Sequence, residues 1–255
     1  MRFIEKITNG QTVLGPFSKT SDASMIEAMG YAGFDFIIID LEHGPNSILN
    51  AQHLVRAAQI TGTFPIIRVA ENDAVAIGKA LDIGAQGVQV PQITNAAEAR
   101  QAVAHAKFAP HGMRGVCRFV RAAEYSNKDR FDYFKEANEK FLILQLEGAE
   151  AVANFEEIIQ VDGIDIIFLG PYDLSQALGV SGQINHPLVL EKMTHIMATC
   201  RGKGIKTGVF TDNLTDAKNW IQLGVNYISY SVDVGIMQEA CKHIIQTLTP
   251  QNTLR

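Results

Sequence analysis

The sequence is poor in cysteine and contains no long apolar run. Its three cysteines, Cys117, Cys200 and Cys241, have no CxxC spacing, so we expect neither a disulfide framework nor a zinc site. No apolar run approaches the roughly 20 residues of a membrane helix. The first residues also lack the apolar region of a signal peptide. These absences predict a cytoplasmic protein with reduced thiols.

Basic residues are not in excess, and common nucleotide and hydrolase motifs are missing. The formal net charge is −5 at pH 7, which predicts no nucleic-acid and no membrane partner. The chain has no Walker A loop, no HExxH sequence and no nucleophile elbow. Apolar residues are plentiful instead: 47% of the 255 residues are hydrophobic, enough for a large core.

Short apolar runs alternate with amphipathic stretches along the whole chain. The predicted strands are 12–17, 34–40, 65–69, 87–90, 141–146, 164–169, 206–210 and 227–231. The predicted helices are 22–32, 47–61, 73–83, 96–107, 149–160, 186–203, 213–223 and 234–247. Gly33 and Gly224 follow helical stretches, as expected of helix C-caps. The alternation predicts an α/β protein with a parallel sheet: a closed (β/α)8 TIM barrel fits the count best, and an open doubly wound sheet is the alternative.

Segment 110–140 interrupts this alternation. It carries Arg114, Arg118 and Arg121, which are more typical of a solvated basic face than of a binding site. Insertions on the carboxyl side of a barrel commonly form part of a site or a subunit contact, and we expect that arrangement here. No linker or low-complexity stretch divides the chain, so residues 1–255 are expected to form a single domain.

Polar side chains gather at the carboxyl ends of the predicted strands, which converge on one mouth in a barrel. The candidate site residues are Asp40, Glu42, His43, Arg68, Gln145, Glu147, Tyr172 and Asp173. Glu147 and Asp173 would suit a hard divalent cation such as Mg²⁺ or Mn²⁺. The alternative is that both residues cap the helices that follow them.

Each of the other candidates also allows two interpretations. A histidine such as His43 suits a general base near neutral pH, or fills a hydrogen-bonded structural role. Arg68, on a buried strand, needs a partner: it binds a substrate oxygen or forms an internal ion pair. The turn before Asp173 offers the backbone N–H groups of Tyr172 and Asp173 to a small carboxylate, or is a simple tight turn.

Four segments together with Arg68 resemble the HpcH/HpaI family of class II pyruvate aldolases. These segments are 39–46, 110–115, 145–147 and 170–175, and the similarity extends over about residues 15–244. The resemblance implies a (β/α)8 barrel that assembles as a homo-oligomer, often a hexamer, and exchanges its last helix between partner subunits. It also implies reversible cleavage of a 4-hydroxy-2-oxo acid to pyruvate and an aldehyde.

The resemblance further implies a divalent metal, Mg²⁺, Mn²⁺ or Co²⁺. Glu147 and Asp173 would hold this metal, Gln145 would lie beside it, and pyruvate would chelate it through its carboxylate and keto oxygens. Metal polarisation makes the methyl group of pyruvate acidic, and the resulting enolate attacks the aldehyde.

The resemblance assigns roles to the remaining polar residues by position. His43 takes the base role through a metal-bound water, and Arg68 stabilises the enolate oxygen. Asp82 falls where family members have an aspartate that reaches a histidine of a neighbouring subunit. Asp40 and Glu42 are then expected to orient other side chains rather than to bind the metal.

Some positions depart from well-known family members. Phe17 replaces a tryptophan and Tyr172 replaces a smaller residue, while Arg118 and Tyr125 fall in a variable loop. These positions are expected to border the aldehyde. The resemblance therefore leaves the identity of the acceptor aldehyde open, whereas it does imply pyruvate as the other product. Arg118 would favour an aldehyde with a carboxylate. The competing functions are an oxaloacetate decarboxylase and a coenzyme-A-ester lyase with the same enolate chemistry, and a non-catalytic barrel.

Overall fold

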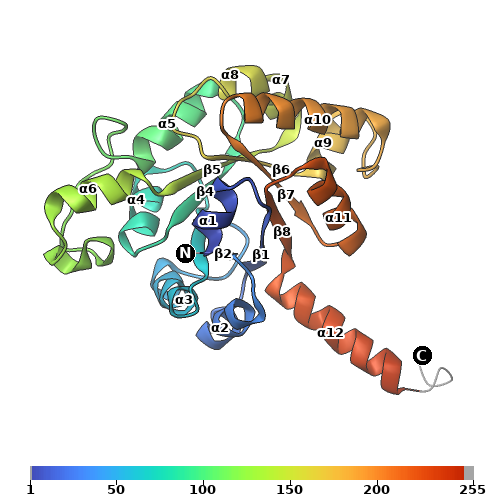
Figure 1. The fold of residues 1–255 in the computed structure, drawn as a ribbon, viewed down its shortest axis with the longest axis horizontal. Helices are drawn as coiled ribbons and strands as arrows, with labels where there is room; N and C mark the ends of the chain where they lie inside the picture. Colours follow the sequence, from blue (N-terminus) through green and yellow to red (C-terminus); the bar gives the residue numbers. More distant parts are fainter. Residues whose placement is uncertain (1, 250–255) are drawn as a thin grey trace.

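Eight parallel strands close into a barrel in the computed structural model, which describes residues 2–249 (Figure 1). They are β1 (Val13–Ser18), β2 (Phe36–Asp40), β3 (Phe64–Arg68), β4 (Gly87–Ile93), β5 (Phe141–Leu146), β6 (Ile166–Leu169), β7 (Lys206–Thr211) and β8 (Tyr227–Val232). Each strand pairs with the next, and β8 pairs with β1. The predicted strands and the (β/α)8 barrel are confirmed, and the open sheet is excluded.

Helices surround this barrel. They are α1 (Arg2–Thr8), α2 (Ala23–Ala32), α3 (Ile48–Ile60), α4 (Ala74–Asp82), α5 (Ala96–Ala106), the 3₁₀ segment η1 (Arg121–Ser126), α6 (Arg130–Asn138), α7 (Gly148–Ala153), α8 (Phe155–Ile158), α9 (Pro171–Ala177), α10 (Pro187–Gly202), α11 (Leu214–Leu223) and α12 (Asp233–Leu248). Gly33 and Gly224 end α2 and α11 in the left-handed conformation, as predicted. The sequence did not predict α1 and α9, and the helix predicted over 149–160 is divided at Asn154. Within the described residues no helix is long and apolar enough to cross a membrane.

The strands read as unbroken apolar runs because both faces of the sheet are buried. In β2, Phe36 and Ile38 point into the barrel, while Ile37 and Ile39 pack against the surrounding helices. The amino-terminal end of the barrel is closed by α1, whose Phe3 stacks on Phe64 with ring centroids 4.1 Å apart. This plug leaves the carboxyl end of the barrel as the open end.

The inserted segment lies at the amino-terminal end, so the prediction that it lies on the carboxyl side is wrong. Helix α5 already returns the chain to the amino-terminal end, and the extra residues extend the connection into β5. Arg121 donates to the carbonyl of Ile83, just after α4, and Lys140 donates to Gln86, just before β4. The insertion therefore covers the end opposite the predicted site.

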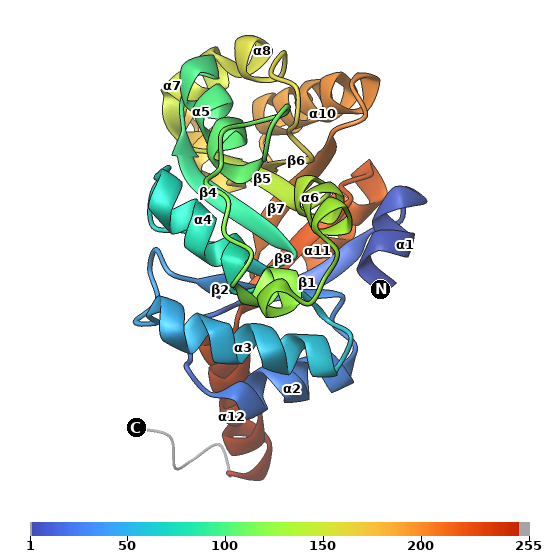
Figure 2. The ribbon, with the colours of Figure 1, turned by 90° about the vertical axis from the view of Figure 1, so that its left-hand side faces the viewer.

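Helix α12 leaves the barrel instead of packing against it. It projects away from the other helices in both views (Figures 1 and 2). Met237, Cys241, Ile244 and Leu248 recur on one face of the helix, and all four are exposed. Leu14, on the outer face of β1, is 38% exposed. An apolar stripe of this kind is typical of a surface that packs on another chain.

Candidate active site

A cavity of about 240 Å³ opens at the carboxyl end of the barrel. Its lining residues are Phe17, Lys19, Arg68, Gln145, Phe168, Gly170, Pro171, Tyr172, Asp173, Phe210 and Val232. Five of the predicted site residues are thus brought together, from β1, β3, β5 and the start of α9. The cavity combines an apolar aromatic side with a small number of charged groups, as small-molecule sites usually do.

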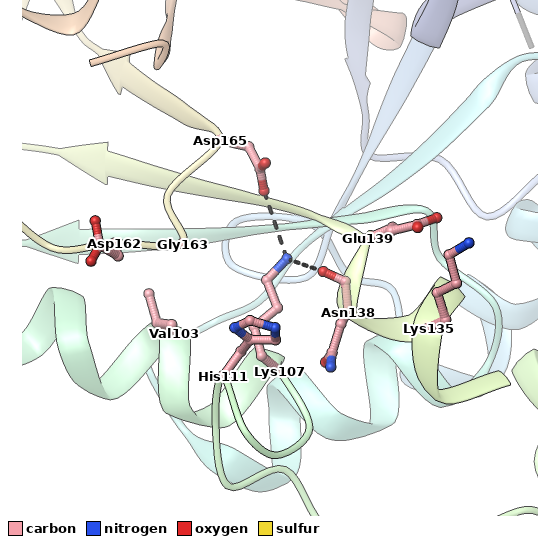
Figure 3. A pocket seen from close by; sticks show the side chains of 9 residues that line it. All are labelled: Val103, Lys107, His111, Lys135, Asn138, Glu139, Asp162, Gly163 and Asp165. Atoms are coloured by element: carbon pink, nitrogen blue, oxygen red, sulfur yellow. Dashed lines mark hydrogen bonds and ion pairs between the residues drawn. The ribbon is translucent and has the colours of Figure 1, made fainter. Parts of the chain in front are cut away.

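A larger cavity, of about 450 Å³, lies at the amino-terminal end (Figure 3). Its central cation is Lys107, whose ammonium group donates to the carbonyls of Asn138 and Lys140 and lies 3.8 Å from Asp165. Burial lowers the pKa of Lys107, against the effect of Asp165. The ammonium group ties the inserted segment to the barrel and is fully engaged there, so the smaller cavity is the better candidate site.

Arg68 is held rigidly by two carboxylates. Its Nε and Nη2 donate to the two oxygens of Asp40 at 2.9 and 2.7 Å, and its Nη1 lies 2.9 Å from Glu42. Burial alone would raise the pKa of Asp40, but hydrogen bonding and charge from Arg68 outweigh it and hold that pKa below its usual value. Arg68 is therefore paired with two carboxylates and also lines the cavity.

The turn after β2 is built on the same aspartate. Asp40 accepts hydrogen bonds from the backbone N–H groups of Glu42 and His43. The side chain of His43 is 63% exposed, and its Nε2 lies 3.8 Å from a carboxylate oxygen of Glu42. His43 consequently stands at the rim, and it is not among the residues that line the cavity.

Neither Glu147 nor Asp173 makes a side-chain cap bond, although Glu147 occupies the N-cap position of α7. Glu147 precedes α7 and Asp173 lies in the first turn of α9, yet neither helix has a side-chain cap bond. Gln145 donates a hydrogen bond to Glu147 and accepts one from Gln89 at 2.6 Å. Burial raises the pKa of Glu147, and the nearby charges of Glu42 and Asp173 raise it further. The two carboxylates therefore lie close enough for the charge of Asp173 to act on Glu147, and neither is used in a cap bond.

Asp82 lies at the opposite end of the barrel from this cavity. It ends α4 and forms an ion pair with Arg114, whose side chain is only 3% exposed. The interpretation of Arg114 as part of a solvated face is therefore wrong. Arg118 donates to carbonyls of its own inserted segment, those of Ser126 and Lys128. Within one chain, neither Asp82 nor Arg118 contributes to the cavity.

Four lining residues escaped the sequence analysis: Lys19, Phe168, Phe210 and Val232. Lys19 follows the last residue of β1, so the criterion applied to the other strands, a polar residue at the carboxyl end, would have found it. The two phenylalanines lie within apolar strands, where an aromatic residue is indistinguishable in sequence from ordinary core.

Known proteins resemble the chain over nearly its whole length. The 2-dehydro-3,6-dideoxy-6-sulfogluconate aldolase of Pseudomonas putida is 36% identical over 236 residues, 92% of each chain. The 4-hydroxy-2-oxo-heptane-1,7-dioate aldolase of Salmonella arizonae is 34% identical and covers 92% of this chain and 89% of its own. The solved structure of an HpcH/HpaI aldolase/citrate lyase family protein from Burkholderia cenocepacia matches with a TM-score of 0.86 and 31% identity, over 94% of this chain and 96% of that one.

A family model gives the same result. The model described as HpcH/HpaI aldolase/citrate lyase matches residues 13–240. This range includes all eight strands and every polar residue of the cavity. The named relatives are carbon–carbon lyases, in agreement with the predicted class of enzyme. The chain belongs to the HpcH/HpaI aldolase/citrate lyase family, as its motifs predicted.

Proposed function

We propose that the chain is a metal-dependent aldolase that reversibly cleaves a 4-hydroxy-2-oxo acid to pyruvate and an aldehyde. One observation carries the proposal: Glu147 and Asp173, both free of capping bonds, lie beside the fixed guanidinium of Arg68 at the carboxyl end of a barrel. The aldolase activities named for the two relatives support it. We expect the enzyme to work in the cytoplasm.

The two carboxylates fit a hard divalent cation. Within residues 2–249, no three His, Cys, Asp or Glu side chains form a complete metal site. Two carboxylates with the rest of the coordination sphere left to water and substrate are what Mg²⁺ commonly accepts. A side chain at Gly170 would collide with the carboxylate of Asp173, so the glycine keeps that carboxylate free. When bound, the cation would polarise the substrate's oxygens.

The protein groups then supply orientation and proton transfer. Arg68 keeps its free N–H donors for an oxygen that gains negative charge as the C3–C4 bond breaks, and Asp40 and Glu42 hold it in place. Gln145 fixes Glu147 through its amide. His43 accepts the proton of the 4-hydroxyl group from the rim. Tyr172 and Phe17 border the substrate.

The direct test is pyruvate release from a 4-hydroxy-2-oxo acid. Chelation with EDTA is expected to abolish release, and Mg²⁺, Mn²⁺ or Co²⁺ is expected to restore it, because the two carboxylates require a cation between them. The control is the same buffer exchange carried out without EDTA, which should leave the rate of pyruvate release unchanged. Full activity after metal removal would refute the proposal.

Replacing His43 separates this function from oxaloacetate decarboxylation, its closest competitor. The exposed position of His43 is compatible with decarboxylation too, because that reaction needs no base on a hydroxyl group. His43→Asn is expected to lower aldol cleavage about 100-fold and to change oxaloacetate decarboxylation less than threefold. His53→Asn, on α3, is the matched control. Equal losses in both reactions would argue against His43 as the base.

We also propose that the enzyme is a homo-oligomer, with α12 packed on a partner subunit and Asp82 directed toward the partner's site. The exposed stripe of α12 supports the first part. The position of Asp82 at the closed end of its own barrel supports the second. A hexamer built from dimers would satisfy both. A monomer in light scattering at micromolar concentration would contradict the arrangement.

A further inference from the structure

One buried amide beside the cavity is not used by the proposed chemistry, that of Gln89. It lies in β4, is completely buried and is not among the residues that line the cavity. We infer that Gln89 is a positioning residue: it fixes the direction in which Gln145 presents its amide to Glu147, and the metal site needs it for full affinity. The effect on the metal rests on the proposed function, whereas the effect on Gln145 rests on the contacts alone.

Gln89 points into the interior of the barrel. Its neighbours Val88 and Val90 pack among the residues that face the helices, and successive side chains of a strand point to opposite faces of the sheet. Its register partner on β5, Ile143, belongs to the apolar cluster that fills the barrel. An apolar residue would suit this position better than an amide, because burying a polar group costs free energy unless it is hydrogen-bonded. Packing therefore does not account for Gln89.

Two amides in sequence connect Gln89 to a proposed metal ligand. Nε2 of Gln89 donates to Oε1 of Gln145 at 2.6 Å, and Nε2 of Gln145 donates to Oε1 of Glu147. Gln145 lines the cavity, so the hydrogen bonds run from the buried interior of the barrel to the site. Among the residues that the structure describes, none donates to Oε2 of Glu147, and this oxygen remains available for a cation.

The charge of Glu147 sets the direction of both hydrogen bonds. A carboxylate can only accept, so Gln145 must turn its NH₂ group toward Glu147 and its carbonyl group away from it. That carbonyl needs a donor, which Gln89 supplies. If the amide of Gln145 turned over, two oxygens would face each other at Glu147 and two NH₂ groups would meet at Gln89. The two contacts therefore stabilise the same orientation of Gln145.

This arrangement leaves one atom of Gln89 without a partner. Its Oε1 is buried and accepts no hydrogen bond from any residue in the described part of the chain. A buried acceptor of this kind lowers stability, and few are found in native proteins. Gln89 cannot turn this oxygen toward Gln145 without losing the donor that holds Gln145 in place. The unpartnered oxygen is thus a consequence of the positioning role.

Gln89→Met separates positioning from a role in the core, since methionine has the same length but no donor. The variant also removes the unpartnered oxygen, so the midpoint of urea unfolding is expected to stay the same or to rise. Calorimetric titration of the full chain with Mn²⁺ is expected to show binding about tenfold weaker than in wild type, as for other groups that orient metal ligands. Gln101→Met, at an exposed glutamine of α5, is the matched control and should change neither quantity.

A double-mutant cycle shows whether Gln89 acts through Gln145. Gln145→Met alone is expected to weaken Mn²⁺ binding at least as much as Gln89→Met, and the two substitutions together should weaken it no further than Gln145→Met. Additive losses would mean that Gln89 acts on the barrel as a whole, and would overturn the inference. Wild-type affinity for Mn²⁺ in Gln89→Met would overturn it as well.

A crystal structure of Gln89→Met distinguishes this inference from the proposed function. Gln145 is expected to leave its contact with Glu147 in the variant. If it does so although wild type binds no Mn²⁺, the metal proposal fails and the positioning of Gln145 by Gln89 stands. If Gln145 keeps the contact with Glu147, the inference fails whatever the affinity for the metal.

Discussion

Replacing Asp173 with asparagine is expected to lower kcat/KM for pyruvate release about 1000-fold, because a divalent cation contributes several kcal/mol of charge stabilisation. Asp173 lies exposed in the first turn of α9 and makes no cap bond there. The amide keeps the shape of the side chain but not the charge that holds a cation. The free energy of unfolding should therefore change little. Steady-state kinetics and urea unfolding measure the two effects.

Two neutral replacements provide the control for this experiment. Asp162→Asn alters an exposed aspartate near the other end of β6 and should leave kcat/KM unchanged. Glu147→Gln should reproduce the loss seen for Asp173, whereas Glu150→Gln, three residues further along α7, should not. Calorimetric titration with Mn²⁺ should show weaker binding in both affected variants. Wild-type activity in Asp173→Asn would exclude the proposed metal site.

Arg68→Met is expected to lower the free energy of unfolding by roughly 3–5 kcal/mol at pH 7, as for other buried ion pairs that lose one partner. Asp40 is completely buried, and the variant leaves its charge uncompensated. Methionine retains the stem that packs on Phe17, so the loss reports on charge more than on packing. Urea unfolding measures it. Arg100→Met, an exposed arginine of α5, is the control.

Acidification should reduce the loss of stability caused by Arg68→Met. The sign of this pH dependence follows from the pKa of Asp40. In the wild type that pKa lies below its ordinary value, so the contribution to stability is present at neutral pH and is lost as the pH falls through the folded-state pKa. In Arg68→Met, only the backbone N–H groups of Glu42 and His43 still oppose the effect of burial, which is the largest single cause, so the pKa of Asp40 is expected to rise. The folded variant then takes up a proton at higher pH than the unfolded chain, so its stability increases on acidification. A difference between variant and wild type that widens from pH 7 to about pH 5 would contradict this account.

The barrel and the polar side of the cavity could be predicted from the sequence for the same physical reason. Strands buried on both faces require unbroken apolar runs, so their ends are easy to locate, and the first polar residues after them stand at the mouth. Arg68, Gln145 and Asp173 follow from that criterion. Asp40 and Glu42, which the sequence predicted to orient other side chains, both pair with Arg68.

Other features depend on contacts that sequence spacing does not encode. The inserted segment was assigned to the wrong end although the predicted helix over 96–107, which α5 matches, already placed the extra residues after a helix and therefore at the amino-terminal end. Arg114 was taken as solvated, although its partner Asp82 lies 32 residues earlier in the chain. The projection of α12 could not be inferred from its apolar stripe, because the same stripe would suit a helix packed on its own barrel.

Asp233 belongs to α12 and also holds the segment that follows β1. It is the first residue of α12, where its carboxylate accepts from the N–H of Val234, and it is also the acceptor that holds residues 18–20 beside the cavity. The outward-projecting helix and the lysine that lines the cavity thus share one buried carboxylate. A displacement of α12 moves this carboxylate, and Lys19 with it. The base of an exposed helix and one side of the cavity are thus joined through the hydrogen bonds of a single side chain.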